Sequence, residues 1–235
     1  MPPAAFVRNT LTALLAAACF TASPASAAGR GDDPGNQDLL FEITRNGSPV
    51  GSHSVTVRHD AAGLRAESSS RIAVRMFGIT VYRLDYTSVS RWTDGRMVAL
   101  DSVTDDAGTV TRVSATLDGD DLRIATNGET ATAPLGLQPT DHWNSAVIGA
   151  TEVLNTLTGK INRVTMTAQG RDNVPAGGRL RPATRYAYHG ELEATVWYDA
   201  AGHWTGLRFA ARDGSIIDYV CRRCGPDAVV AERPR

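Results

Sequence analysis

Two cysteines near the C-terminus form the sharpest local motif, Cys221-Arg-Arg-Cys224. A redox-active Cys-x-x-Cys pair usually lies at a helix N-terminus, where the helix lowers the thiol pKa. This pair instead follows a strand-like run and precedes Gly225-Pro226. We therefore expect a structural disulfide, which by chain entropy contributes only about 2 kcal/mol. A thiol oxidoreductase is the alternative, and a zinc site lacks a second pair of ligands at suitable spacing.

The five histidines are scattered, and two of them have a carboxylate close in sequence. His142 follows Asp141, and His189 precedes Glu191, so each pair could act as a base and its orienter. However, no serine or cysteine lies in a nucleophile-elbow context, and no glycine loop is suited to cradle a phosphate. We predict no catalytic residue, cofactor or metal ion. Whether the chain is an enzyme stays open, with a non-enzymatic role favoured.

Aromatic and basic side chains form the most extended candidate site. Asp199-Ala-Ala-Gly202 is typical of a hairpin turn, and pairing Tyr198 with His203 would place Trp197 opposite Trp204 on one face. We expect these side chains to line an apolar pocket, with an arginine receiving an anionic headgroup. The predicted ligand-binding residues are Trp143, Trp197, Trp204, Tyr219, Arg208 and Arg185. The alternative is that the aromatic residues form a packed core.

Regularly spaced turn signals indicate the elements that would position this site. Pairs such as Asn46-Gly47, Asp94-Gly95 and Asn127-Gly128 separate runs rich in Val, Ile, Thr, Tyr and Leu, which predicts an antiparallel meander. Between residues 140 and 159, apolar residues recur at spacings of three and four, which predicts one amphipathic helix ending at Gly159. The predicted fold is mostly β, an antiparallel meander forming a half-open barrel or strongly curved sheet packed around that helix.

The N-terminal residues indicate an exported protein. A short apolar run follows Arg8, and Ala25-Ser26-Ala27 is an Ala-x-Ala cleavage pattern, so residues 1–27 are predicted as a signal peptide cleaved near Ala27. We expect a disordered tether over residues 28–37, a single β domain over 38–225 and a disordered tail over 226–235. The expected location is periplasmic or secreted.

Charge and hydropathy narrow the range of partners. The formal net charge is −1 and no basic run is present, which argues against nucleic acid as a partner. After the predicted signal peptide, no apolar run is long enough to form a transmembrane segment in the mature chain.

A series of motifs resembles an uncharacterised family of exported bacterial β-sheet proteins, a domain of unknown function, over nearly the whole mature chain. The motifs are Trp92…Asp94-Gly95, Ser102-Val-Thr104…Gly108, His142-Trp143, Thr156-x-Thr158-Gly159, Arg185-Tyr186, Trp197-Tyr198-Asp199 and Asp213-Gly-Ser-x-Ile-x-Tyr219. This resemblance implies export and a β-rich fold, and it supplies no activity. By shape, the expected fold is also similar to periplasmic half-barrels, some of which carry lipids.

These observations lead to three functional hypotheses. A sheet with two apolar faces and one helix to cover one of them favours non-enzymatic binding of an amphiphilic or lipid-like molecule in the cell envelope. The second is a structural or interaction module that docks on another envelope protein. The third is a hydrolase or thiol oxidoreductase.

Overall fold

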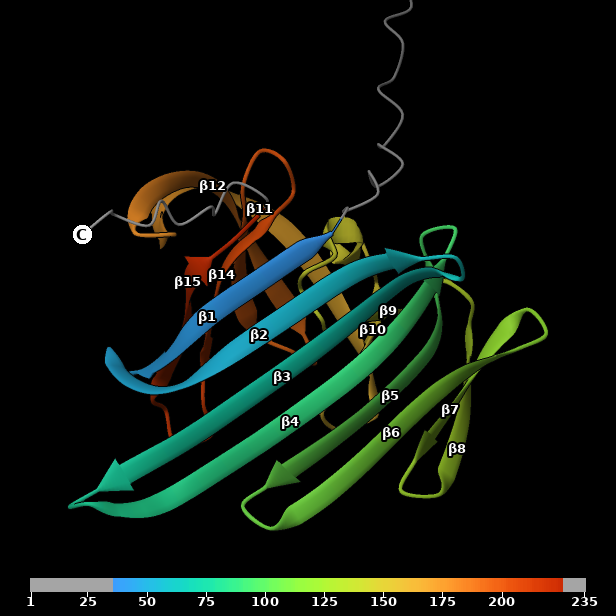
Figure 1. Cartoon of the computed structure of the whole chain (residues 1–235), viewed down its shortest axis with the longest axis horizontal. Coiled ribbons are helices and arrows are strands. Elements are labelled where there is room, and N and C mark those ends of the chain that lie inside the picture. Colours follow the sequence, from blue (N-terminus) through green and yellow to red (C-terminus); the bar gives the residue numbers. More distant parts are fainter. Residues whose placement is uncertain (1–35, 226–235) are drawn as a thin grey trace, which may run out of the picture. The chain divides into compact units, whose positions relative to one another are not determined.

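The computed structural model describes residues 36–225, which form fifteen strands and one turn of 3-10 helix (Figure 1). The first eight strands are β1 (Gln37–Arg45), β2 (Ser48–Asp60), β3 (Gly63–Met76), β4 (Ile79–Thr93), β5 (Arg96–Asp106), β6 (Thr109–Asp118), β7 (Asp121–Thr126) and β8 (Glu129–Pro134). They are followed by β9 (Gln138–Pro139), η1 (Ser145–Val147), β10 (Glu152–Leu154), β11 (Ile161–Ala176), β12 (Arg179–Gly190), β13 (Ala194–Tyr198), β14 (Trp204–Ala210) and β15 (Ile216–Arg223).

The strands form one curved, almost entirely antiparallel sheet, which confirms the predicted meander (Figure 1). Its order is β8-β7-β6-β5-β4-β3-β2-β1-β15-β14-β13-β12-β11-β10-β9, so strands adjacent in this order are consecutive in sequence except β1 and β15, and the consecutive strands β8 and β9 stand at its two ends. A further bridge joins Ala176 of β11 to Cys221 of β15, so the first and last of the strands β11–β15 also pair with each other. Strand β15 is therefore bonded both to β1 and to β11.

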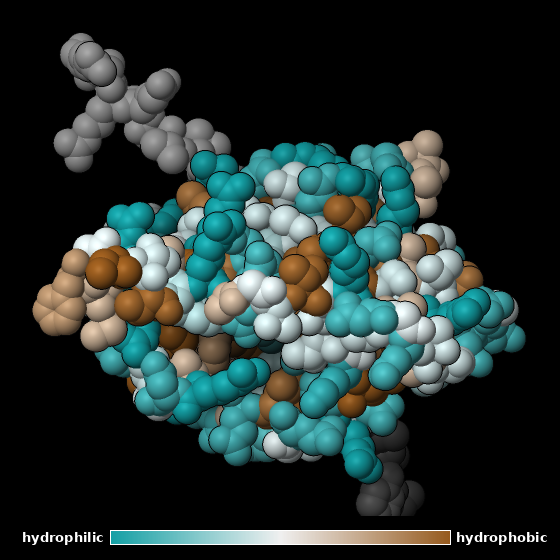
Figure 2. Space-filling model, turned by 90° about the horizontal axis from the view of Figure 1, so that it is seen from below, coloured by the Kyte–Doolittle hydropathy of each residue, from teal (hydrophilic) through white to brown (hydrophobic). Residues whose placement is uncertain are grey.

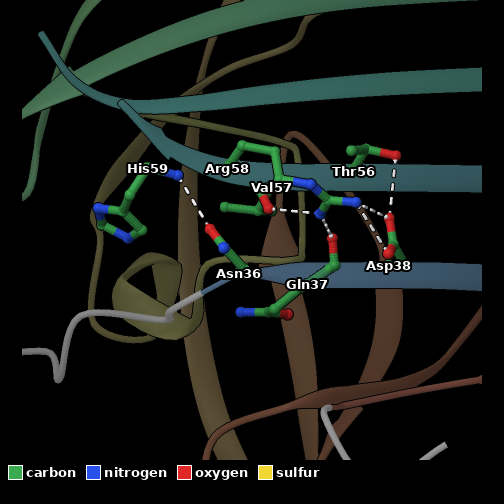
Figure 3. A network of polar contacts seen from close by, with 7 residues as sticks. All are labelled: Asn36, Gln37, Asp38, Thr56, Val57, Arg58 and His59. Carbon is green, nitrogen blue, oxygen red and sulfur yellow. Dashed lines mark hydrogen bonds and ion pairs between the residues drawn. The ribbon is translucent and has the colours of Figure 1, made fainter. Parts of the chain in front are cut away.

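The start of β1 is held by a polar network on β2 (Figure 3). Arg58 donates to both carboxylate oxygens of Asp38, at 2.7 and 2.9 Å, and to the backbone carbonyl of Gln37 at 2.8 Å. The Asn36 side chain accepts from the backbone N–H of His59 at 3.0 Å. The last two residues of the predicted tether, Asn36 and Gln37, thus take part in the fold, while the predicted signal peptide and the tail over residues 226–235 lie outside the described residues.

The predicted tight turns form because their residues tolerate a left-handed backbone. Asn46-Gly47, Asp94-Gly95 and Asn127-Gly128 all have positive φ at both positions, as two-residue hairpin turns require. Gly51 serves a different purpose in β2. A Cβ at that position would overlap the backbone carbonyl oxygen of Arg71, so only glycine permits the close approach of β2 and β3.

The predicted helix over residues 140–159 is wrong. Those residues form η1, the short strand β10 and turns, and β10 pairs with both β9 and β11. The Asn144 side chain caps only one 3-10 turn, after which Ile148 is extended and Gly149 has a φ of 93°. The apolar spacing arose because an irregular segment buries Trp143, Val147 and Leu154 in turn.

Residues 135–160, which include the stretch expected to be helical, are called the inner segment. The inner segment lies against the sheet where the helix was expected. Trp143 meets Trp92 of β4 edge to face with ring centroids 5.3 Å apart, and Ser102 of β5 donates to the Thr156 carbonyl at 2.6 Å. The core contains buried residues from β1–β8, the inner segment and β11–β15. Trp143, Trp204, Tyr198, Phe41 and Ile43 are its largest fully buried side chains.

Candidate functional site

The six predicted ligand-binding residues are divided between the two faces of the sheet. In β13 and β14, Tyr198 pairs with Trp204 and Trp197 pairs with Gly206, so the expected pairing of Trp197 with Trp204 is wrong. A register shift between Trp197 and Tyr198 inserts an extra residue into β14, which reverses the alternation of faces. Trp204 therefore lies in the core beside Tyr198, whereas Trp197 lies on the opposite face.

The core side holds Trp143, Trp204 and Tyr219. The Trp204 ring lies 4.0 Å from that of Phe41 and 6.0 Å from that of Tyr219, between ring centroids. Burial raises the pKa of Tyr219 to about 12, while a hydrogen bond with Ser70 lowers it. Trp143 and Trp204 belong to one buried cluster and Tyr219 packs against it, which fits the alternative of a packed core.

The opposite face holds Trp197, Arg185 and Arg208. Asp172 accepts from the Trp197 indole at 2.8 Å and from the Arg185 guanidinium at 3.0 Å. Arg208 donates to Asp218 at 2.6 Å. Both arginines are therefore engaged by carboxylates and are separated by the sheet from the buried aromatic residues, so the six residues do not form one pocket.

The predicted disulfide between Cys221 and Cys224 is present in the structure. Both cysteines are buried, and their Cα atoms are 6.1 Å apart. The Cys221 carbonyl accepts from the Gly177 backbone N–H at 3.1 Å, and the Cys224 carbonyl accepts from Arg181 at 3.3 Å. The disulfide thus lies at the end of a strand, where it secures contacts to the β11–β12 hairpin.

Neither suggested histidine and carboxylate pair forms. Asp141 accepts from the hydroxyls of Tyr86 and Ser88, at 3.2 and 3.4 Å, while the His142 ring contacts Tyr188. Burial raises the pKa of Asp141 to about 6, against a smaller lowering by these two hydrogen bonds. Glu191 accepts from the Arg163 backbone N–H at 2.6 Å.

A buried Ser and His pair escaped the sequence analysis. His53 Nδ1 lies 2.6 Å from Ser70 Oγ, and the His53 ring is surrounded by Phe41, Trp204 and Tyr219. Burial, and secondarily the neighbouring His142, lower the pKa of His53 to about 3. Such a weak base, enclosed by aromatic rings, is poorly suited to activate a serine at neutral pH. The geometry favours a structural hydrogen bond over hydrolase chemistry.

The hairpin between β3 and β4 presents the most conspicuous apolar surface. Ladder pairing of β2 with β3 extends only as far as Ile72, and that of β4 with β5 only as far as Leu84. The Ala107 backbone N–H also donates to the Arg83 carbonyl at 2.9 Å, so residues 73–82 project as two strands without backbone pairing to a third. At its end, four exposed side chains form what we call the apolar tip. They are Met76 (54% exposed), Phe77 (98%), Ile79 (69%) and Val81 (54%).

Apolar side chains of the tip point to both sides of the hairpin. Met76 and Ile79 pair directly, continuing the inner face of the sheet. The register shift after Val74 leaves Val81 as the extra residue, on the outer side with Arg83. Figure 2 shows the resulting hydrophobic cluster at the left end of the molecule, over the β3–β4 hairpin.

Arginines and a surface hollow lie behind the apolar tip. A hollow of about 470 Å³ is lined by the outer surfaces of β2, β3 and β4, including Arg71, Arg83 and Asp85. Asp85 pairs with Arg83 and lies 4.0 Å from Arg71. Arg75, closer to the tip, is exposed and has no ion-pair partner among the described residues.

A second hollow of about 410 Å³ lies on β6–β8 and is lined by polar residues such as Asp118, Asp121 and Arg123.

Residues 36–225 contain no cluster of three or more His, Cys, Asp or Glu side chains placed to hold a metal ion. In the same range, no helix has the length and apolar character that crossing a membrane would require.

Known proteins are similar to this chain in family and in fold. The family described as Domain of unknown function (DUF6134) matches residues 41–222, which confirms the predicted resemblance to an uncharacterised β-sheet family. The crystal structure of a beta-barrel-like protein of Domain of Unknown Function DUF1849 from Brucella abortus is similar with a TM-score of 0.56 and 10% identity, covering 80% of this chain and 96% of that chain. At that identity the likeness concerns the fold alone. No curated protein matches the chain.

Proposed function

We propose that this chain, which belongs to the family described as Domain of unknown function (DUF6134), is a non-enzymatic protein that binds amphiphilic, lipid-like molecules through its apolar tip. The proposal includes a location in the cell envelope, periplasmic or secreted, for which the predicted signal peptide over residues 1–27 is the support. The single observation that carries it is the exposure of four neighbouring apolar side chains at the end of a projecting hairpin.

Phe77 is an unfavourable residue for a solvent-exposed turn. Its φ is 51°, in the left-handed region where Asn, Asp and Gly are preferred, and its side chain is 98% exposed. In water, the backbone of this residue is in an unfavourable conformation and its apolar side chain is not buried. Full burial of such a side chain is worth about 1.5–3 kcal/mol, so contact with an apolar phase would more than offset the conformational cost.

The proposed mode of binding differs from the pocket expected from the sequence. The space between the sheet and the inner segment is occupied by large buried side chains, including Trp143, Trp204 and Phe41. An amphiphile would therefore meet the protein at the tip, outside the core. Because apolar side chains occupy both sides of the hairpin, an environment that surrounds the tip fits better than a surface that covers one side.

Binding to micelles of a neutral detergent tests the proposal without electrostatic attraction. We expect the purified protein to associate with dodecyl maltoside micelles and Phe77→Asn to weaken that association by about tenfold or more, since burial of one phenyl side chain is lost. Asparagine suits the positive φ of residue 77, so this variant should fold at least as well as the parent protein.

Leu180→Asn is the matched control, because Leu180 is 66% exposed at a different hairpin. This control should bind micelles as the parent protein does. Equal binding by the parent protein and Phe77→Asn would refute the proposed function. If neither the parent protein nor Phe77→Asn bound micelles, and Phe77→Asn lost an association of the parent protein with another protein, the interaction-module hypothesis would be supported instead.

A further inference from the structure

We infer that the amphiphile is the surface of an anionic lipid bilayer, and that arginines behind the apolar tip contact its headgroups. This inference rests on the proposed function and adds the chemical class of the partner. Three arginines and no acidic residue occur between residues 71 and 83, on a chain whose formal net charge is −1. Positive charge is therefore concentrated on the projecting hairpin, whereas Asp85 and its cross-strand neighbours Asp105 and Asp106 lie at its base.

The three arginines share the outer side of the hairpin. Arg71 pairs with Asp85, Ala73 with Arg83 and Arg75 with Thr80, and alternate residues of a strand point to the same side. We call Arg71, Arg75 and Arg83 the arginine collar. Its members are exposed: 84% of the Arg71 side chain and 68% of the Arg83 side chain are accessible, and Arg75 is also exposed.

The spacing between collar and tip matches the layers of a bilayer. Arg75 precedes Phe77 by two residues, which in a strand separates them by roughly 7 Å along the hairpin. The polar headgroup region on each side of the hydrocarbon core is roughly 5–8 Å thick. With Phe77 among the outer acyl carbons, the Arg75 guanidinium would lie at the depth of the phosphates.

Charge within the collar is incompletely neutralised. Asp85 engages Arg83 and lies near Arg71, whereas no described acidic side chain pairs with Arg75. A lipid phosphate or other anionic headgroup can accept two parallel hydrogen bonds from a guanidinium. The hollow beside Arg71 and Arg83 provides a concave surface for a further headgroup behind the first.

An acidic groove on another protein would offer the same charge but a less suitable shape. Such a groove would have to enclose Met76 and Ile79 on one side of the hairpin and Val81 on the other. Acyl chains surround an inserted tip without that requirement. The distribution of apolar side chains therefore favours a lipid surface.

Co-sedimentation with vesicles distinguishes headgroup recognition from apolar insertion. We expect tighter binding to vesicles of mixed phosphatidylglycerol and phosphatidylcholine than to phosphatidylcholine alone. Arg75→Gln should weaken binding to the anionic vesicles about fivefold, since one juxtamembrane arginine is lost, and should leave binding to neutral vesicles unchanged. Arg96→Gln, at an exposed position at the start of β5, is the matched control and should bind both vesicles as the parent protein does.

The outcomes separate the two proposals. Equal binding of the parent protein to both kinds of vesicle, with a loss in Phe77→Asn, would overturn the headgroup inference and leave the proposed function intact. An undiminished affinity of Arg75→Gln for anionic vesicles would overturn the role of the collar. No effect of Phe77→Asn on either kind of vesicle would overturn the proposed function itself.

Discussion

Replacement of Asp141 by asparagine should remove a loss of stability that the parent protein undergoes between about pH 4 and pH 7. Asp141 is buried, and its carboxylate accepts only two long hydrogen bonds, from Tyr86 and Ser88. Burial raises its pKa from 3.8 to about 6. Because the folded-state pKa lies above the unfolded-state value, the folded protein is favoured when this carboxyl is protonated and loses stability as the pH rises from 3.8 to about 6.

The magnitude follows from the displacement of the pKa. A shift from 3.8 to about 6 corresponds to about 3 kcal/mol of stability lost at neutral and alkaline pH, of which about 2 kcal/mol is lost between pH 4 and pH 7. The amide introduced by Asp141→Asn would remain neutral throughout and could still accept from Tyr86. The difference in unfolding free energy between Asp141→Asn and the parent protein should therefore change by about 2 kcal/mol, in favour of the variant, over that window.

Urea denaturation of both proteins across the pH range measures this difference. Taking the difference cancels the opposing contributions of other groups, such as His53, whose neutral form is favoured by burial. Asp101→Asn, at an exposed position of β5, is the control and should show no comparable trend. A difference between Asp141→Asn and the parent protein that stays constant with pH would refute the argument that an ionised Asp141 destabilises the fold.

Two further substitutions test the fold. Gly51→Ala should lower the unfolding free energy by about 2 kcal/mol or more, because the new Cβ overlaps the Arg71 carbonyl. Its control is Gly128→Ala, at an open turn, which should lower the unfolding free energy by only about 1 kcal/mol. Equal effects in urea denaturation would contradict the close approach of β2 and β3. Replacing both Cys221 and Cys224 by serine should lower stability by about 2 kcal/mol and preserve micelle binding, whereas loss of binding by a folded variant would assign the disulfide a role in function.

Local turn chemistry made most of the sheet predictable. Pairs such as Asn46-Gly47 and Asp94-Gly95 favour tight hairpins whatever surrounds them, and consecutive hairpins produce a meander. The Cys221–Cys224 disulfide was equally local, because only two residues lie between its members in sequence. The signal peptide and the location that it implies stay predictions.

Tertiary structure decided the features that the sequence analysis missed. The extra residue in β14 reverses the faces of Trp197 and Trp204, and no turn signal marks it. In the inner segment, irregular burial of Trp143, Val147 and Leu154 imitated a helical period. The candidate pocket failed for both reasons, since its residues depended on that register and on that helix.

The apolar tip was overlooked because its exposure depends on neighbouring strands. Only the shorter reach of β2 and β5 leaves residues 73–82 without a third strand beside them. Phenylalanine is uncommon where φ is positive, so the sequence gives no reason to place Phe77 in an exposed turn of that conformation.

Insertion depth at the apolar tip tests the central claim most directly. Phe77→Trp would place an indole at the most exposed position of the hairpin, and vesicles with lipids brominated along their acyl chains quench only indoles that reach the hydrocarbon. We predict that Phe77→Trp is quenched more strongly than the parent protein, whose Trp92, Trp143 and Trp204 are buried and whose half-buried Trp197 lies on β13. Vesicle binding with identical quenching in the two proteins would show that another surface contacts the lipid.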